Sequence, residues 1–452
     1  MRTNNIRDII WQVATHLRDV VFSQNYSFSA LRVLFLKYVI DNYTGAKTAE
    51  DMQACARAQK MFALRDTANG LDSVIPVLEY IDKAYGLDHI LSGNETIEAY
   101  GRELFGLDYS RKKKKADETV FQELLEYIGS LDLEERFGAP LGRDLAQAIV
   151  QSLGSGYERS SFSGEYVTHS FISSIAEAIL AVQDDDVFLD FASGVGASTM
   201  SICGEARPTV LNAEINRLNA ASAAMLYILA GFKRMKIICA DSLSEPLSDF
   251  RGNKIFVEPP FTAKVFRSED TKYSDASLAS IHHIIHNYCS APGRAVMVCQ
   301  GSFLFQNKPQ TVSLREELVE GGMLKAVITL PELPSYSTAI TVHLLVISKE
   351  DAHSNNDVLF IDLAKEMKSR RNSNKTNLDL QAEIVAKIED CIENPHSVPG
   401  FCCMVTYEDV RKSKYNLVPG AYLQTAEEED SITIEEINAQ LKDLYELLQQ
   451  KS

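Results

Sequence analysis

The residues best suited to chemistry in this 452-residue sequence are acidic groups that follow short apolar runs. Asp190 ends the run VFLD, Glu214 ends TVLNAE, and Asp241 follows KIICA. Because the carboxyl ends of parallel strands meet at one edge of a sheet, we expect these side chains to converge. Gly194 and Gly196 form a turn that opens a helix, where a ligand can approach the backbone closely.

These three acids suit a nucleoside cofactor that carries no phosphate, because carboxylates repel a pyrophosphate. Glu214 can accept hydrogen bonds from ribose hydroxyls, and Asp241 with Ser242 is placed to meet the exocyclic amine of an adenine. The pattern favours S-adenosylmethionine over NAD. The alternative is a dinucleotide-binding Rossmann half with coincidental acids, although the glycine pattern is not the full Gly-x-Gly-x-x-Gly.

Short apolar runs alternate with helix-length segments over residues 151–425, and they predict the elements that position the acids. The runs begin at Val187, Thr209, Lys236, Lys254, Arg294, Leu324 and Thr341. Buried runs of this kind indicate a parallel sheet covered on both faces. We therefore predict a doubly wound, Rossmann-like α/β domain of the kind that binds S-adenosylmethionine.

The two flanking regions carry helical periodicity. Residues 1–150 are predicted to form an all-helical N-terminal domain, because apolar residues recur there every three or four positions. Residues 426–452 contain an a/d heptad pattern from Ile434 to Leu448, which is typical of a helix that packs on another helix. That second helix can belong to a partner chain or to this chain, and the sequence leaves both possibilities open.

Composition and charge restrict the function classes. The apolar content of 45% and charged content of 24% are typical of a globular protein. The net charge of −17 argues against a protein that coats nucleic acid by bulk electrostatics. The basic runs 111–115 and 365–375 are either local DNA contacts or solvated loops. No run reaches the roughly 20 apolar residues of a membrane span, and no signal peptide is recognisable, so we expect a cytoplasmic protein.

No metal site or hydrolase site is predicted. His282 and His286 have the spacing of one helix face, but no third ligand accompanies them at a recognisable spacing. The eight cysteines include no CxxC pair and are interpreted as reduced, mostly buried residues. Ser160, Ser161 and Ser163 lack the Gly-x-Ser-x-Gly frame of a hydrolase.

The chain resembles one family over nearly its whole length. GEYVT from Gly164, DFASGVG, ADSL, EPPF and GRAVMVCQGSFLF occur in an order and spacing similar to the modification subunits of type I restriction-modification systems and related N6-adenine DNA methylases. The helical start LRVLFLKYVIDNY resembles the family's N-terminal domain, and KYNLVPGAYL resembles its closing segment.

The resemblance implies a cofactor site and a target-base site. The implied S-adenosylmethionine ligands are Thr168, Asp190, Ala192, Gly194, Gly196, Glu214, Asp241 and Ser242. The implied target-base residues are Glu258, Pro259, Pro260 and Phe261. In the family, an Asn or Asp oxygen and the first proline's carbonyl accept the hydrogens of the adenine amine. The aromatic ring stacks on a base flipped out of the duplex.

The sequence departs from the family at the position of that Asn, where it has Glu258. Glutamate still offers an acceptor oxygen, but it is one methylene longer than aspartate. Misplacement by about 1 Å in a preorganised site costs on the order of a hundredfold in rate. Glutamate here also resembles the non-catalytic partner of the eukaryotic adenine-N6 RNA methyltransferase heterodimer. In the cofactor half, His169 replaces a proline and Val195 replaces a small polar residue.

Three hypotheses follow. The first is a subunit of an adenine-N6 DNA methyltransferase that docks a separate specificity subunit through residues 430–452, with a second methyltransferase subunit or a restriction subunit as further candidate partners. The second is a catalytically inactive scaffold of the same fold that positions DNA or an active subunit, and Glu258 motivates it. The third is a methyltransferase that acts on protein glutamine or RNA, because a Pro-Pro-aromatic element suits any planar amide or amine.

Overall fold

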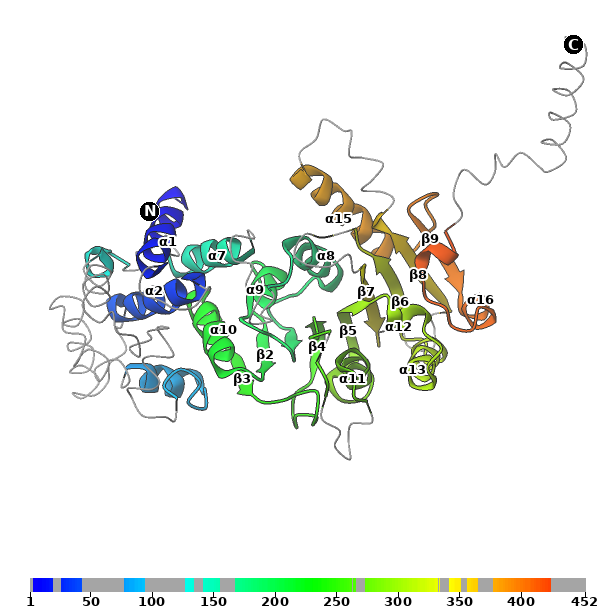
Figure 1. The fold of residues 1–452 in the computed structure, drawn as a ribbon, viewed down its shortest axis with the longest axis horizontal. Helices are drawn as coiled ribbons and strands as arrows, with labels where there is room; N and C mark the ends of the chain where they lie inside the picture. Colours follow the sequence, from blue (N-terminus) through cyan, green and yellow to red (C-terminus); the bar gives the residue numbers. More distant parts are fainter. Residues whose placement is uncertain are drawn as a thin grey trace, which may run out of the picture.

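The computed structural model describes residues 3–18, 26–42, 77–93, 127–133, 141–154, 167–261, 263–265, 273–331, 333, 341–350, 356–364 and 377–423. Within these residues, helices at the N-terminal end lie beside a single large sheet (Figure 1). Both basic runs, the three serines from 160 to 163 and the heptad tail lie outside the described residues.

A nine-stranded mixed sheet forms the framework, with the strand order β3-β2-β1-β4-β5-β7-β6-β8-β9. The strands are β1 (Val187–Asp190), β2 (Thr209–Glu214), β3 (Met235–Cys239), β4 (Gly252–Val257), β5 (Cys289–Gln300), β6 (Leu324–Thr329), β7 (Val342–Ser348), β8 (Asp357–Asp362) and β9 (Cys402–Thr406). Every predicted apolar run is a strand, and β8 and β9 are additional. The predicted α/β fold class is confirmed.

The sheet departs from the expected wholly parallel arrangement at two strands. β3, β2, β1, β4 and β5 are parallel neighbours, but β7 lies antiparallel between β5 and β6. β9 lies antiparallel to β8 at the far edge. All residues of β7 are buried. Burial on both faces removes the polar and apolar alternation that accompanies many antiparallel strands, so the sequence of β7 carries no sign of its direction.

Helices cover both faces of the sheet, and each face has its own hydrophobic core. Phe188 and Leu189 are neighbours on β1 and belong to opposite cores, as the pleat of a strand requires. Figure 1 shows α8 and α15 on one side of the strands and α11 and α13 on the other. The covering helices are α8 (Ser170–Leu180), α9 (Ala197–Cys203), α10 (Arg217–Leu229), α11 (Ala276–His283), α12 (Ser302–Phe305), α13 (Pro309–Glu320), α15 (Asn377–Glu393) and α16 (Tyr407–Lys412).

The N-terminal helices α1 (Thr3–Arg18), α2 (Tyr26–Asn42) and α7 (Leu141–Gly154) join the core on the α10 side. A Cβ atom at Gly142 would lie 2.7 Å from the carbonyl oxygen of Leu229, so α7 packs closely against the end of α10. The described part of residues 1–150 contains helices and turns and no strand. The boundary at residue 150 stays a prediction.

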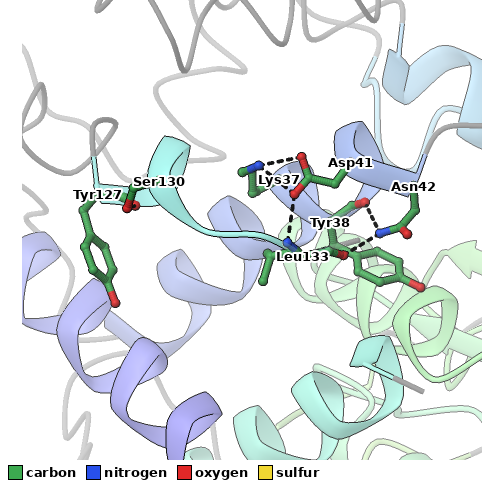
Figure 2. Close-up of polar contacts among 7 residues, drawn as sticks. All are labelled: Lys37, Tyr38, Asp41, Asn42, Tyr127, Ser130 and Leu133. Carbon is green, nitrogen blue, oxygen red and sulfur yellow. Dashed lines mark hydrogen bonds and ion pairs between the residues drawn. The ribbon is translucent and has the colours of Figure 1, made fainter. Parts of the chain in front are cut away.

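A polar cluster ties the end of α2 to residues 127–133 (Figure 2). Asp41 accepts hydrogen bonds from Lys37 Nζ at 2.5 Å and from the backbone N of Leu133 at 3.0 Å. Asn42 Nδ2 donates to the carbonyl of Leu133 at 2.7 Å. Pairing offsets the cost of removing these charges and amides from water, so α2 is held firmly where it packs against α10.

Among the described residues, no helix combines the length and the hydropathy that a membrane span requires.

Candidate cofactor and target-base site

The carboxyl ends of β1, β2 and β4 lie side by side and bring the predicted acids together. β1 pairs in parallel with both β2 and β4. Asp190 therefore lies between the strand ends that carry Glu214 and Glu258, and the charges on both act on it. Of the three acids expected to converge, Asp190 and Glu214 end neighbouring strands, and Asp241 follows β3, the next strand along the same edge.

Asp190 is buried at the end of β1 and supports the turn that follows. Its Oδ1 accepts a hydrogen bond from Ala192 N at 3.1 Å, and its Oδ2 accepts one from the hydroxyl of Ser198 at 3.1 Å. Burial raises the pKa of Asp190 to about 7; the charges of Glu214 and Glu258 act in the same direction, and the two hydrogen bonds oppose them. The Asp190 carboxyl group therefore titrates near neutral pH.

Gly194 and Gly196 both adopt the left-handed backbone conformation, with φ of +52° and +81°, but for different reasons. A Cβ at Gly194 would meet nothing within 4 Å, so this part of the turn borders open space. A Cβ at Gly196 would lie 2.6 Å from the hydroxyl oxygen of Tyr227 on α10. That hydroxyl accepts a hydrogen bond from Asn212 Nδ2 at 2.6 Å. Gly194 opens the turn, and Gly196 lets it pack on the helix behind.

Glu214 holds the same turn from the end of β2. Its Oε2 accepts a hydrogen bond from Gly194 N at 2.8 Å, and its Oε1 accepts one from Asn216 N at 2.8 Å. Glu214 therefore links the end of β2 to the turn that follows β1. Ile215 beside it is 68% exposed and was not predicted as a site residue. An apolar side chain directly after a strand-ending acid is the signal that could have found it, since it can pack on a flat ring.

Asp241 is largely engaged by its own turn. Its Oδ1 accepts from the backbone N atoms of Leu243 and Ser244 at 3.2 and 3.1 Å, and its Oδ2 accepts from the Ser244 hydroxyl at 2.6 Å. A carboxylate has about four acceptor positions, so capacity remains for an adenine amine. The Ser242 hydroxyl donates to the carbonyl of Phe191 and ties this loop to the turn after β1.

Two side chains support the loop that carries Asp241 and Ser242. His283 ends α11, and Tyr288 ends the π-helical segment Ile284–Tyr288 that follows it. The hydroxyl of Tyr288 donates to the carbonyl of Ser242 at 2.8 Å. Nε2 of His283 donates to the carbonyl of Leu243 at 3.0 Å, and burial lowers the pKa of His283. These contacts fix the loop that carries Asp241 and Ser242.

His282 and His286, the pair with the spacing of one helix face, contact each other and a carboxylate on a neighbouring helix. His286 Nε2 lies 2.9 Å from a carboxylate oxygen of Glu317 on α13, and the ring of His282 packs 4.4 Å from that of His286. Across the described part of the chain, no group of three or more His, Cys, Asp or Glu residues could hold a metal ion.

Glu258 follows β4 and is held by Thr168, the residue that precedes the cap of α8. The Thr168 hydroxyl donates to Glu258 Oε2 at 2.7 Å. His169 caps α8 by accepting from Phe171 N, and its φ of −62° is the value that a proline would impose. His169 therefore preserves the backbone expected there. The hydrogen bond to Thr168 fixes the longer glutamate side chain in place.

The Pro-Pro-Phe turn lies directly after Glu258. Pro259 is buried, Pro260 is exposed, and Phe261 is half-buried against the core. The Pro260 carbonyl accepts from Ala263 N at 3.1 Å and closes the turn. Val195 is buried in the core, so its branched side chain leaves the open side of the glycine turn free.

The strand order defines a Rossmann-like α/β domain. The sequence profile of the N-6 DNA Methylase family matches residues 155–431, more than half of the chain, and the chain belongs to this family.

Curated relatives extend the similarity. The methylase subunit of the type I restriction enzyme MjaVIII from Methanocaldococcus jannaschii is 25% identical, in an alignment of 398 positions that covers 79% of this chain and 67% of the relative. The methylase subunit of the type I restriction enzyme MpnII from Mycoplasma pneumoniae is 22% identical, in an alignment of 530 positions that covers 98% of this chain and 93% of the relative.

Solved structures share the fold. A type I restriction-modification methyltransferase subunit from Streptococcus thermophilus matches with a TM-score of 0.67 at 18% identity, covering 94% of this chain and 100% of that one. A type I modification subunit from Vibrio vulnificus matches with a TM-score of 0.63 at 14% identity, covering 90% of this chain and 93% of that one.

We predict that Gly196→Ala destabilises the protein more than Gly194→Ala. Both changes place a side chain on a left-handed backbone, which costs about 1–2 kcal/mol. Only the first also drives a methyl group to 2.6 Å from the Tyr227 hydroxyl, which adds about 1–3 kcal/mol. Urea unfolding of the two variants measures the difference, and equal losses would contradict the packing of this turn on α10.

We also predict that the free energy of unfolding falls as the pH rises, because burial of Asp190 favours its protonated form in the folded protein. Its folded-state pKa of about 7 lies above the ordinary value of 3.8. Between these values the folded state alone keeps the proton, so stability falls by up to about 1.4 kcal/mol per pH unit. Asp190→Asn removes this dependence and preserves an acceptor for Ala192 N. Urea unfolding from about pH 5 to pH 8 compares the two proteins, and parallel pH profiles would refute the assignment.

Proposed function

We propose that this chain is the S-adenosylmethionine-binding modification subunit of an adenine-N6 DNA methyltransferase, acting with a separate specificity subunit as in type I restriction-modification systems. The observation that carries the proposal is the convergence of Asp190, Glu214 and Glu258 beside the open turn at Gly194. Membership in the N-6 DNA methylase family and the similarity to type I methylase subunits support it. The proposal places the protein in the cytoplasm.

The residues present fit an S-adenosylmethionine molecule. Glu214 would accept the ribose hydroxyls, Asp241 would accept from the adenine amine, and Ile215 would cover the adenine ring. The open turn at Gly194 leaves room for the part of the cofactor nearest β1. When bound, the cofactor supplies an electrophilic methyl group.

The chain's own residues would prepare the target amine. An adenine amine is a poor nucleophile because its lone pair is delocalised into the ring. The carboxylate of Glu258 and the carbonyl of Pro259 would accept its two hydrogens and draw the nitrogen toward tetrahedral geometry. Phe261 would stack on the flipped base. The Thr168 hydroxyl donates to one oxygen of Glu258, which would help to position the longer side chain.

The second candidate function is an inactive scaffold of the same fold, and the identity of Glu258 favours it. In that case the domain would position DNA or an active subunit without transferring a methyl group.

A methyl-transfer assay on mixed-sequence DNA, in the presence of the specificity partner, separates the two. We expect N6-methyladenine in digested DNA from the wild type, and a loss of about a hundredfold or more in kcat/KM for Glu258→Ala, because a preorganised acceptor is removed. Glu389→Ala is the matched control, because Glu389 is an exposed acid on α15, and it should keep the wild-type activity. Activity that appears only in Glu258→Asn would establish the scaffold instead. Methyl groups found only on RNA or on protein glutamine would refute a DNA substrate.

The partner is proposed to dock on the heptad segment at residues 430–452. Deleting this segment should abolish co-purification with the specificity subunit, because the a/d seam would supply the contact. Circular dichroism of the truncated chain serves as the folding control. If the truncated protein still co-purifies at the wild-type ratio, the docking element lies elsewhere.

A further inference from the structure

We propose that Glu258, held by Thr168, makes this site select a positively charged cofactor over its neutral product. The inference rests on the proposed S-adenosylmethionine site and adds a binding specificity to it. S-adenosylmethionine carries a sulfonium, and loss of the methyl group leaves the neutral thioether of S-adenosylhomocysteine. A carboxylate beside the sulfur therefore stabilises one ligand and not the other.

The position of Glu258 in the fold supports this reading. It follows β4, which pairs directly with β1, and its charge acts on Asp190. Its Oε2 accepts the Thr168 hydroxyl at 2.7 Å, so the carboxylate is fixed toward the same edge of the sheet. Glu258 is only partly exposed, and a partly buried charge is less screened by water and salt. The asparagine usual at this position would carry no charge.

Reaction geometry limits how far the carboxylate can lie from the sulfur. In the proposed reaction the attacking nitrogen would approach the methyl carbon to about 3–3.5 Å, and Glu258 would accept a hydrogen from that nitrogen at about 2.6–3.2 Å. With the carbon–sulfur bond added, the carboxylate would lie within roughly 8–9 Å of the sulfonium. Two opposite unit charges at that separation, at an effective dielectric constant of about 20, attract strongly enough to change affinity by about tenfold or more.

Asp190 and Glu214 are further acidic residues at this edge of the sheet, and hydrogen bonds from Ala192, Ser198, Gly194 and Asn216 hold them in place. Both remain when Glu258 is substituted, so a change in the ratio of affinities reports Glu258 alone. Acidic residues after β1 and β2 belong to the motifs on which the resemblance rests. The charge at Glu258 is the one that replaces a neutral family residue, so its effect can be removed by substitution.

Isothermal titration calorimetry of the full-length protein tests the proposal with three ligands: S-adenosylmethionine, S-adenosylhomocysteine and sinefungin, which carries an ammonium in place of the methylsulfonium. Titrations at about pH 8 keep Asp190 ionised, because its pKa is about 7. We expect the ratio of the Kd for S-adenosylhomocysteine to the Kd for S-adenosylmethionine to fall about tenfold in Glu258→Gln. Sinefungin should lose affinity in parallel with S-adenosylmethionine.

Glu245→Gln is the matched control. It removes one charge from an exposed residue between β3 and β4, and it should leave the ratio of the two Kd values unchanged. Glu258→Asn replaces Glu258→Gln if circular dichroism shows that the latter does not fold. Binding with the same ratio in the wild type and in the Glu258 variant overturns the selectivity while leaving the cofactor site intact. Failure of the folded wild type to bind any of the three ligands overturns the proposed cofactor site itself.

Discussion

The site depends on one buried carboxyl group. Asp190 ends the central strand β1 with its side chain removed from water, and it is anchored by Ala192 N and the Ser198 hydroxyl. An acid buried so completely persists only where hydrogen bonds satisfy it. Those hydrogen bonds shape the turn that contains Gly194 and Gly196. The turn places the backbone N of Gly194 where it donates a hydrogen bond to Glu214. The raised pKa of Asp190 is the energetic consequence of this arrangement.

The rest of the fold keeps that turn rigid. The sheet separates two hydrophobic cores, so the strands are fixed from both faces. Gly196 presses the turn onto Tyr227 of α10, and the N-terminal helices pack against the same helix through Gly142. On the opposite face, Tyr288 and His283 hold the loop that follows Asp241. The helical N-terminal region thus contributes to the geometry of a site that contains none of its residues.

Glu258 is held at the end of β4 by the Thr168 hydroxyl, so the local structure accommodates a glutamate there. Its carboxylate adds a negative charge to an edge that already carries Asp190 and Glu214. Coulomb interactions at this edge require only proximity and limited screening, and the charge of Glu258 already acts on Asp190.

The sequence by itself determined seven of the nine strands and the α/β fold class, because apolar runs are local patterns. The cofactor class that the strand-end acids favour stays a prediction. The sequence did not show the antiparallel direction of β7, since a strand buried on both faces has no informative alternation. Only the tertiary structure decided that Thr168 bonds Glu258 across 90 positions of chain, and that Val195 faces the core. Contacts between distant segments follow from packing, which no local pattern encodes.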